Sequence, residues 1–578
     1  MTYNPGPRQW WKDAVFYQIY PRSFQDTNGD GVGDIPGIIS RLDELADLGV
    51  DALWLSPLYV SPDADNGYDI ANYRDIDPRY GTLVDFDALV AAAKARGIRI
   101  VMDLVINHTS DEHPWFEASR RRQDPYTDYY IWRPGTPDGP PPNNWTGFFM
   151  GSAWQWDDVR GEYYLHLFDP KQPDLNYRNP AVTEEVKDVL RFWLDRGVAG
   201  FRCDVISLLY KSSLDDGRGR LPIIRGLEHY KAQPGTHRIL QELRRDVLDP
   251  YGAFTVGETV MVTLDEAKKL SDPDRGELDL VFYFDHLEVD RRMAKYIPKG
   301  FRADELLRRL TRWQQGLAWN AVYLENHDQP RIVSHYGDDQ EFWSRSARLL
   351  ATLLLTLRGT PFIYQGQEIG MTNGDFAGLD QLDDVESHNM SALLERVGIP
   401  YNVRWRLIRP ASRDNARTPM QWDASPGAGF TTVRPWLGIN ANSARINHAQ
   451  QKADPHSVLA FYRSLIKLRK QSDTLSGGGF EPVYADRSVM VYRRTPVPGS
   501  TDPAYTVWLN FSGRTRRLRQ PWLASAVSPV PTASEYGVHP PVCVVSNTGR
   551  RTLDGVLLPW EAMVVREVDA PTWRAEQP

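Results

Sequence analysis

The stretch Thr183–Val205, TEEVKDVLRFWLDRGVAGFRCDV, decides the fold. In Thr183–Arg196 apolar side chains recur at helical spacing, and a short apolar run, Gly200–Val205, follows directly. A continuous apolar strand next to an amphipathic helix indicates a parallel strand that is covered on both faces. The stretch therefore predicts one helix–strand unit of an α/β protein.

The same unit recurs along most of the chain. The predicted strands are Val15–Tyr20, Ala52–Ser56, Arg99–Val105, Gly200–Val205, Phe254–Gly257, Leu280–Phe284, Ala321–Leu324 and Pro361–Gln365. Helical patterns lie between them, among them Ile38–Leu48, Phe86–Arg96 and Leu349–Leu357. Eight such units favour a closed (β/α)8 TIM barrel over an open sheet, because nothing marks a switch point in strand order.

Two gaps between these units are too long for simple loops. His108–Arg178 is rich in Trp, Tyr, Pro and Asn, which predicts an inserted subdomain B after the third strand, and a second excursion covers about residues 370–438. Short alternating runs from about Gly477 predict a C-terminal antiparallel β-domain. We expect the catalytic barrel in residues 1–107 and 179–476, subdomain B in 108–178 and the β-domain in 477–578.

Composition excludes several classes of protein. The 578 residues contain 67 Lys and Arg against 75 Asp and Glu, and this balance argues against nucleic acid or an anionic membrane as partner. The two cysteines, Cys203 and Cys543, cannot build a disulfide framework, and the longest apolar run, about Leu349–Leu357, is too short to span a bilayer. With no signal pattern in Met1–Lys12, we expect a soluble, cytoplasmic protein, as a monomer or small homo-oligomer.

Charged side chains gather at the ends of the predicted strands. Asp103 ends the third strand, Asp204 the fourth, Glu258 the fifth, and the seventh runs into Glu325–Asp328. A single such acid would most often be a cap or a surface ion pair, but in a barrel these strand ends meet at one mouth. Two carboxyl groups without a metal-type cluster, serine nucleophile or phosphate loop are typical of glycoside hydrolysis.

Spacing within the fourth strand suggests roles for two of these residues. Arg202 and Asp204 lie two positions apart and share one face of the strand, so we expect the guanidinium to keep Asp204 ionised. Cys203 should point the other way, into the helix layer. Glu258 has no neighbouring cation in sequence, which suits an acid that must hold its proton.

The segments around these residues resemble the α-amylase-type retaining glycosidases (glycoside hydrolase family 13), and within them the oligo-1,6-glucosidase and α-glucosidase group. The likeness extends over nearly the whole chain and is carried by Tyr20–Phe24, Asp65–Asp69, Asp103–His108, Gln172–Asn176, Gly200–Val205, Val256–Glu258, Glu325–Asp328 and Ser412–Trp422.

The resemblance implies that Asp204 is the nucleophile, Glu258 the general acid/base and Asp328 the carboxylate that grips the sugar in the transition state. It implies an exo-acting α-glucosidase that removes α-1,6-linked glucose from isomaltose and short isomalto-oligosaccharides, with no cofactor for catalysis. The substrate-binding residues that it implies are Asp65, Tyr68, His108, Phe168, Gln172, Arg202, Val205, His327 and Arg413.

The Asp65–Arg413 pair and Val205 each have a physical rationale, and Phe168 has an open alternative. Asp65 and Arg413 together would grip the terminal glucose and block longer chain ends. Val205, directly after the nucleophile, resembles the α-1,6-acting members and would crowd an α-1,4-linked aglycone. Phe168 fits equally well as a pocket wall or as subdomain core.

Other activities stay open at this point. An α-1,4-preferring or broad α-glucosidase, a transglucosylase or a sucrose isomerase would use the same triad. A catalytically inactive transporter subunit would instead carry a membrane segment and eroded acids, and this sequence has neither. Glu325 stands in place of the usual Asn, so the local charge near His327 should differ from that in the group. The stretch Gly226–His237 matches the group only loosely, and because such loops shape the aglycone site, substrate length and the balance of hydrolysis and transfer stay open.

The stretch Asp26–Asp34, DTNGDGVGD, resembles the first nine positions of a calcium loop. Its twelfth position is Gly37 rather than Glu, so it is not a complete EF-hand. We predict a structural Ca²⁺, with Mg²⁺ as the alternative, held by Asp26, Asn28, Asp30, Asp34 and the carbonyl of Val32. A turn-rich loop whose acids have other roles is the competing interpretation.

Overall fold

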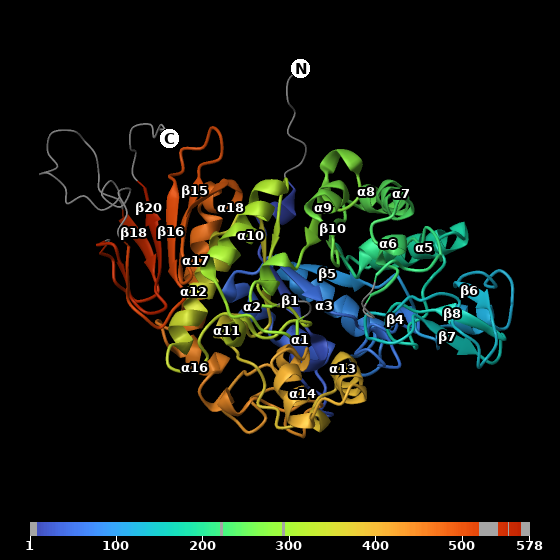
Figure 1. Cartoon of the computed structure of the whole chain (residues 1–578). Helices are drawn as coiled ribbons and strands as arrows, with labels where there is room; N and C mark the ends of the chain where they lie inside the picture. The colour runs from blue at the N-terminus through green and yellow to red at the C-terminus, as the bar shows by residue number, and fades with distance from the viewer. Residues whose placement is uncertain (1–8, 220–223, 292–294, 519–541, 553, 568–578) are drawn as a thin grey trace, which may run out of the picture.

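The computed structural model describes residues 9–219, 224–291, 295–518, 542–552 and 554–567. Its centre is a barrel of eight parallel strands in the order β11-β10-β9-β5-β2-β1-β13-β12 (Figure 1). The strands are β1 Phe16–Ile19, β2 Ala52–Leu55, β5 Arg99–Leu104, β9 Gly200–Cys203, β10 Phe254–Glu258, β11 Leu280–Phe282, β12 Ala321–Val322 and β13 Thr360–Tyr364. Each overlaps one predicted apolar run, so the barrel prediction is confirmed.

Strand register places the functional strand ends at one level. β1 pairs with both β2 and β13, which brings the first and last strands of the barrel together. β9 lies between β5 and β10, with Arg202 opposite Asp103 on one side and opposite Val256 on the other. Because alternate residues share a face, this register directs Asp103, Arg202 and Glu258 into the same region of the barrel mouth.

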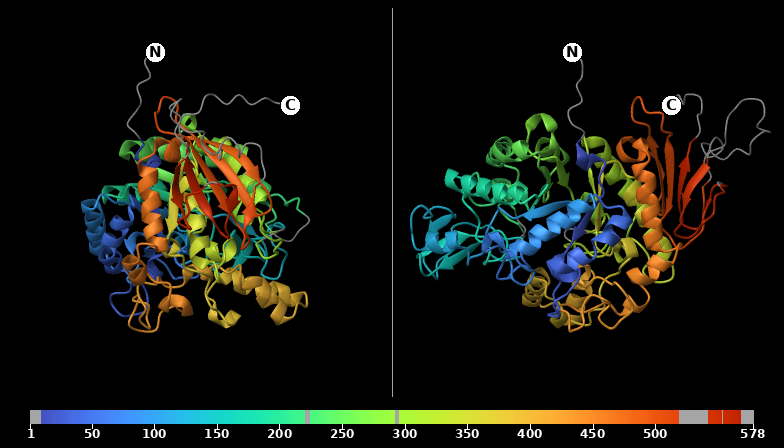
Figure 2. Two further views of the ribbon diagram at one scale, coloured as in Figure 1. Left: turned by 90° about the vertical axis from the view of Figure 1, so that its left-hand side faces the viewer. Right: turned by 180° about the vertical axis from the view of Figure 1, so that it is seen from behind.

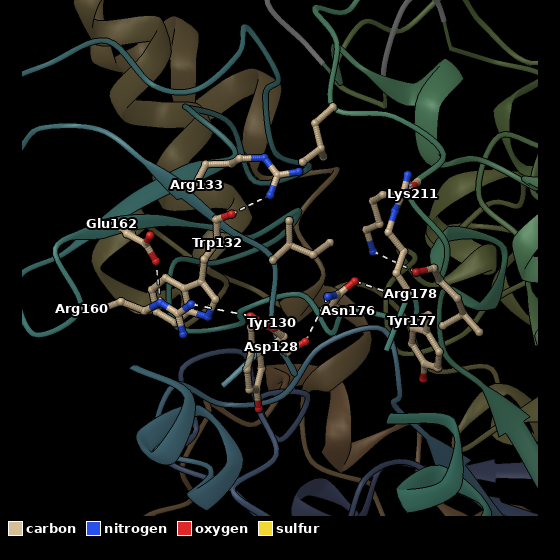
Figure 3. Close-up of a pocket in the computed structure, with 13 residues that line it drawn as sticks. Asp128, Tyr130, Trp132, Arg133, Arg160, Glu162, Asn176, Tyr177, Arg178 and Lys211 are labelled. Carbon is tan, nitrogen blue, oxygen red and sulfur yellow. Dashed lines mark hydrogen bonds and ion pairs between the residues drawn. The ribbon is translucent and has the colours of Figure 1, made fainter. Parts of the chain in front are cut away.

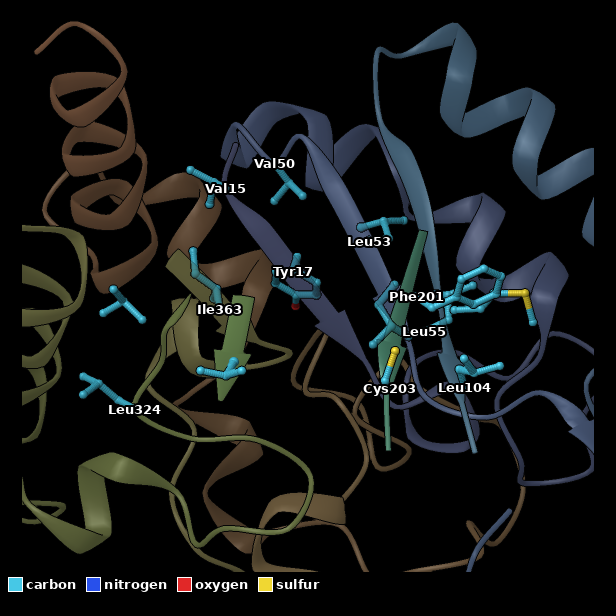
Figure 4. Packing of buried hydrophobic residues seen from close by; sticks show 14 of the residues in the cluster. Val15, Tyr17, Val50, Leu53, Leu55, Leu104, Phe201, Cys203, Leu324 and Ile363 are labelled. Carbon is cyan, nitrogen blue, oxygen red and sulfur yellow. The ribbon is translucent and has the colours of Figure 1, made fainter. Parts of the chain in front are cut away.

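Side chains along each strand point alternately into the barrel and toward the helices, and this alternation builds two packed layers. Phe16, Trp54, Phe254 and Phe362 belong to one buried cluster inside the barrel, where the rings of Phe16 and Phe362 lie 4.5 Å apart. The intervening residues face the helices in a second, larger cluster that includes Tyr17, Leu53, Phe201 and Cys203 (Figure 4). Cys203 therefore lies in the helix layer, as its alternation with Arg202 predicts.

Helices cover the outside of the barrel. They include α1 Ile35–Ser40, α2 Leu42–Leu48, α3 Leu83–Ala95, α5 Pro180–Asp195, α7 Pro234–Leu243, α9 Leu264–Ser271, α10 Ala303–Gly316, α12 Trp343–Thr356 and α17 Val458–Lys470. α5 begins at Pro180 because the Asn179 side chain accepts from the Ala181 amide and proline suits a first helical position. The single helix predicted over Ile38–Leu48 is wrong: the chain forms two helices that break at Arg41, where ψ is 5°.

Three additions surround the barrel, as Figures 1 and 2 show. After β5, β6 Trp132–Pro134, β7 Trp154–Asp157 and β8 Glu162–Leu165 form a three-stranded antiparallel sheet, preceded by α4 Pro114–Arg120. After β13, α13 Val385–Arg396 and α14 Tyr401–Ile408 form a helical pair, followed by α15 Asp414–Arg417. The hairpin β3 Tyr59–Val60 and β4 Asn72–Ile76 carries Asp65 and Tyr68 in its loop.

An antiparallel sheet ends the described chain, in the order β14-β15-β16-β20-β18. Its strands are β14 Gly479–Ala485, β15 Val489–Thr495, β16 Tyr505–Asn510, β18 Val542–Ser546 and β20 Ala562–Arg566. Residues 519–541, 553 and 568–578 of the proposed β-domain lie outside the described residues. In the portion of the chain that is described, no helix combines the length and apolar character that a bilayer crossing requires.

Candidate active site

Arg202 is the centre of a buried cluster of carboxyl groups at the barrel mouth. Its Nη1 lies 2.7 Å from Asp103 Oδ1 and 2.7 Å from Asp204 Oδ1, and its Nη2 lies 2.6 Å from Glu258 Oε2. The Arg202 side chain is 1% exposed, so these contacts form away from bulk water. The predicted nucleophile and the predicted acid/base are thus brought together on one guanidinium.

Three carboxyl groups share this single positive charge, and that changes the expected ionisation. Burial raises the pKa of Asp204 well above its usual range; Arg202 opposes the rise, and Glu258 and Asp103 add to it. The expected contact between Arg202 and Asp204 is present, but Arg202 also pairs with Asp103 and Glu258, so its charge is not reserved for Asp204. The arrangement therefore places two carboxyl groups, Asp204 and Glu258, on one guanidinium.

His327 and Asp328 lie beside this cluster and are held in place from several elements. The Gln18 amide donates to His327 Nδ1 over 2.7 Å, which leaves the proton on Nε2. His327 Nε2 lies 2.6 Å from the Tyr68 hydroxyl and 3.0 Å from Asp328 Oδ2, and Tyr68 in turn donates to Asp103 Oδ2. Tyr68, His327 and Asp328 therefore form one network with the carboxyl cluster.

Arg413 closes the other side of the site. Its Nη2 lies 3.1 Å from Asp65 Oδ1 and its Nη1 3.6 Å from Asp328 Oδ1. Burial raises the pKa of Asp65 to about 6, although Arg413 and Arg417 lower it. The predicted pairing of Asp65 with Arg413 thus appears directly in the structure.

Gln172 and His108 extend the network toward the inserted subdomain. The Gln172 amide donates to Asp65 Oδ2 over 3.3 Å and lies 3.2 Å from His108 Nε2. Burial lowers the pKa of His108 to about 4, so its ring is neutral at neutral pH and can exchange hydrogen bonds with hydroxyl groups. Behind it, Asn107 Oδ1 accepts from Lys211, whose ammonium also lies 2.5 Å from the buried Asp174.

Phe168 and Val205 form apolar walls. Phe168 stacks on Phe148 with ring centroids 5.0 Å apart and also lies 5.2 Å from the His108 ring, so it serves both the subdomain core and the site. Val205 has φ 34°, a left-handed conformation that is strained for a β-branched residue. That conformation directs its amide to Glu258 Oε2 at 3.3 Å and packs its side chain with Tyr230, within the departing stretch Gly226–His237.

Two residues at the site were missed by sequence reasoning. Arg417 lies 2.9 Å from Asp328 Oδ1 and its Nε donates to the His327 carbonyl. Asp384 lies 2.7 Å from Arg413 Nε and caps α13. The spacing of four between Arg413 and Arg417 is a signal for a shared face, but nothing near Asp384 indicates its partner.

Burial would raise the pKa of Asp328, yet His327, Arg417 and Arg413 together hold it well below its usual range. Asp328 is therefore negatively charged at neutral pH. Glu325, in contrast, does not alter the charge beside His327 as its sequence position suggested. It lies 3.1 Å from Arg331 and accepts from the Ile332 amide, so its charge is compensated within its own loop.

The glycine-rich loop satisfies its acids internally. Asp34 accepts from the amides of Thr27, Asn28 and Gly37 and from the Thr27 hydroxyl, which fills its four acceptor positions. Asp26 accepts from Gly29, Gly31 and Thr431. Across the described ranges, no three His, Cys, Asp or Glu side chains gather in a way that could hold a metal ion. An ion here would have to rely on Asn28, Asp30 and the Val32 carbonyl and displace some of these hydrogen bonds.

Comparison with known proteins agrees with this geometry. Residues 18–478 match the family model described as "Alpha amylase, catalytic domain". An oligo-1,6-glucosidase of Parageobacillus thermoglucosidasius is 48% identical over 523 residues, which cover 89% of this chain and 92% of that protein. A trehalose-6-phosphate hydrolase of Escherichia coli K12 is 46% identical over 535 residues, which cover 91% and 93%.

Solved structures resemble the whole chain. The crystal structure of isomaltulose synthase from Klebsiella sp. LX3 superposes with a TM-score of 0.89 at 40% identity and covers 97% of this chain and all of that one. The barrel, the carboxyl cluster on Arg202 and these matches lead to one conclusion: the chain belongs to the alpha-amylase family of glycoside hydrolases.

Proposed function

We propose that this enzyme is a retaining, exo-acting α-glucosidase that releases α-1,6-linked glucose from isomaltose and short isomalto-oligosaccharides. The observation that carries the proposal is the contact of Arg202 with both Asp204 and Glu258, within 2.7 Å, at the mouth of the barrel. The oligo-1,6-glucosidase relative, 48% identical over most of its length, supports the substrate class.

Asp204 attacks the anomeric carbon while Glu258 gives its proton to the glycosidic oxygen, so the bond to the aglycone breaks as the glucosyl–enzyme bond forms. Glu258 then takes a proton from water, and the hydroxide displaces Asp204 to release glucose with retained α configuration. This route requires a proton on Glu258 and an ionised Asp204 when attack begins. Retaining enzymes hold the two carboxyl groups about 5–5.5 Å apart, and we expect that separation between Asp204 and Glu258.

Asp328 supplies a fixed negative charge near the oxocarbenium-like carbon, where positive charge develops in the transition state. His327 Nε2, held in its tautomer by Gln18, and the neutral His108 offer hydrogen bonds to glucose hydroxyl groups. The Asp65–Arg413 pair closes the far end of the pocket. This closure supports exo action on short substrates, because a longer chain end would have to displace a buried ion pair.

Glucose release from isomaltose and from maltose, measured side by side at equal concentration, tests the linkage preference. A strong preference for isomaltose supports the proposal. Equal or faster cleavage of maltose would contradict the assigned linkage and favour a broad or α-1,4-preferring α-glucosidase with the same triad.

A second candidate function is glucosyl transfer, because the solved structures that resemble this chain include isomaltulose and trehalulose synthases. Product analysis with sucrose distinguishes it: glucose and fructose indicate hydrolysis, whereas a sucrose isomer indicates transfer. The trehalose-6-phosphate hydrolase relative makes that disaccharide phosphate a third substrate for the same panel.

We also propose that loop 26–34 holds a structural Ca²⁺ through Asp26, Asn28, Asp30, Asp34 and the Val32 carbonyl, with Mg²⁺ as the alternative. Support comes from the alternating oxygen donors and from Gly31, whose φ of 89° makes the sharp turn that such a loop requires. Its contribution would be to stability, because the loop precedes α1 and lies apart from the carboxyl cluster.

For its setting, we propose a cytoplasmic enzyme that acts as a monomer or small homo-oligomer on a small α-glucoside. Both cysteines, Cys203 and Cys543, are free and buried, which suits a reducing compartment. Cell fractionation and size-exclusion chromatography test location and assembly.

A further inference from the structure

A cavity of about 280 Å³ lies between the inserted subdomain and the segment that follows β9 (Figure 3). Arg133 and Arg160 enter it from the subdomain side, and Arg178 and Lys211 enter it from the opposite side. Ile131, Leu209 and Leu214 supply apolar parts of its wall. The cavity is thus lined by four cationic side chains around a partly apolar floor.

Two of the four cations are neutralised by carboxylates. Arg160 lies 2.6 Å from Glu162 and 3.9 Å from Asp128, the two acidic residues of the lining. Lys211 lies 2.5 Å from the buried Asp174 behind the wall. The acids of this region are therefore already committed to Arg160 and Lys211.

The other two cations, Arg133 and Arg178, form no ion pair with a carboxylate in the described ranges. Arg133 Nη1 donates to the Trp132 carbonyl, and Arg178 Nη2 donates to the carbonyls of Lys211 and Ser212. Among the described residues, the other guanidinium N–H groups of both arginines have no hydrogen-bond partner. Burial lowers the pKa of Arg133, and the positive charge of Arg178 lowers it further because the two guanidinium groups repel each other; the charge of Glu162 opposes this effect.

We propose that this cavity binds a phosphate group, with the guanidinium groups of Arg133 and Arg178 as its ligands. Guanidinium presents paired donors that match two oxygens of a tetrahedral oxyanion, and a dianion between the two arginines replaces their repulsion with attraction. The cavity is larger than one phosphate group, so both inorganic phosphate and the phosphate ester of a monosaccharide fit it. The proposal goes beyond the glucosidase activity and does not depend on it.

The site is separate from the catalytic cluster. Lys211 forms the wall between them: its ammonium contacts Asn107 and Asp174 on the catalytic side, and its carbonyl accepts from Arg178 on the cavity side. A ligand that contacts Arg133 and Arg178 therefore does not occupy the glucose pocket between Asp204 and Arg413.

Isothermal titration calorimetry of the full chain at constant ionic strength tests the proposal. The titrants are inorganic phosphate and glucose 6-phosphate, with glucose and chloride as controls. The variants are Arg133→Gln and Arg178→Gln, with Arg406→Gln on the exposed face of α14 as the matched loss of one positive charge. Both cavity arginines are exposed residues, so we expect an unchanged melting temperature and unchanged hydrolysis of isomaltose without phosphate.

The expected result is saturable binding of phosphate at one site, weakened at least about tenfold in each cavity variant and unchanged in Arg406→Gln. Added salt should weaken it further, because exposed charges are screened. Tighter binding of glucose 6-phosphate than of phosphate identifies a sugar ester as the ligand, and equal affinity identifies the free anion. The proposal would be overturned if phosphate showed no saturable binding, or if both cavity variants bound phosphate as tightly as the unaltered enzyme. It would also be overturned if glucose bound but neither phosphate nor glucose 6-phosphate did.

Discussion

Arg417 Nη2 lies 2.9 Å from Asp328 Oδ1, and the same guanidinium donates from Nε to the carbonyl of His327. One side chain from the segment after β13 thus contacts both the carboxylate of Asp328, the proposed transition-state carboxylate, and the backbone beside it. Arg417 is fully buried, so solvent does not weaken this contact.

Replacement of Arg417 by Gln should lower kcat/KM for isomaltose by about 10²-fold, the usual cost of losing one preorganised charged donor. Arg417 helps to hold the pKa of Asp328 well below its usual range, so its loss raises that pKa and moves the acid limb of the rate profile to higher pH. The pH dependence of kcat/KM measures both effects. Arg417→Lys, which keeps the charge, should recover part of the activity and the acid limb; a merely structural role would leave the limb in place.

Replacement of Asp204 by Asn should reduce turnover at least about 10⁴-fold, because the glucosyl–enzyme bond cannot form. Glu258→Gln should be rescued on aryl α-glucosides, whose leaving group needs no proton, while isomaltose hydrolysis stays about 10²–10⁴-fold slower. Steady-state rates on the two substrates test this. Cys203→Ala, between Arg202 and Asp204 but directed into the helix layer, is the control and should keep near-normal rates.

Protonation of Asp65 should weaken substrate binding. Its pKa is about 6, raised by burial, so as pH falls through 6 the carboxylate is lost and its pairing with Arg413 with it. The KM for isomaltose should therefore rise below pH 6. In Asp65→Asn, KM should be high and lack this rise. A KM that is independent of pH in the unaltered enzyme would contradict the assignment.

Replacement of Val205 by Ala should raise maltose turnover relative to isomaltose, because it removes the branched side chain next to Asp204 and Glu258. The rate ratio for the two disaccharides is the measurement. Val198→Ala, a buried valine truncation in the loop before β9, controls for general loosening. An unchanged ratio in Val205→Ala would show that its strained backbone and not its side-chain volume is what the site requires.

Chelation should lower the melting temperature if loop 26–34 holds its cation, because an ion that binds only the folded state stabilises it by mass action. Added Ca²⁺ should restore the melting temperature, and Asp30→Asn should reduce its response to both treatments. Differential scanning fluorimetry follows these shifts. If chelation leaves the melting temperature unchanged, the loop holds no cation, and the role of Asp26 and Asp34 is limited to their hydrogen bonds.

The sequence predicted the barrel well because its strands are buried on both faces and therefore read as continuous apolar runs such as Arg99–Val105. It predicted that Asp103, Asp204 and Glu258 lie at one mouth because strand ends meet there. It could not predict that these three carboxyl groups share Arg202 in space. Nor could it predict Asp384, whose partner Arg413 lies 29 residues further on in an irregular excursion. The break at Arg41 was missed because the apolar pattern continues across it.

The ion pair between Asp65 and Arg413 joins positions 348 residues apart. During synthesis the ribosome completes the loop between β3 and β4, which carries Asp65, long before the segment that contains Arg413 emerges. Until then Asp65 lacks its cation, and Asp328 lacks both Arg413 and Arg417. A nascent or truncated chain that ends before residue 413 can assemble strands, yet it has no closed glucose pocket. Hydrolytic activity therefore reports that translation has passed Arg413 and Arg417, and a nonsense mutation before residue 413 should abolish sugar turnover even though all eight barrel strands have been made.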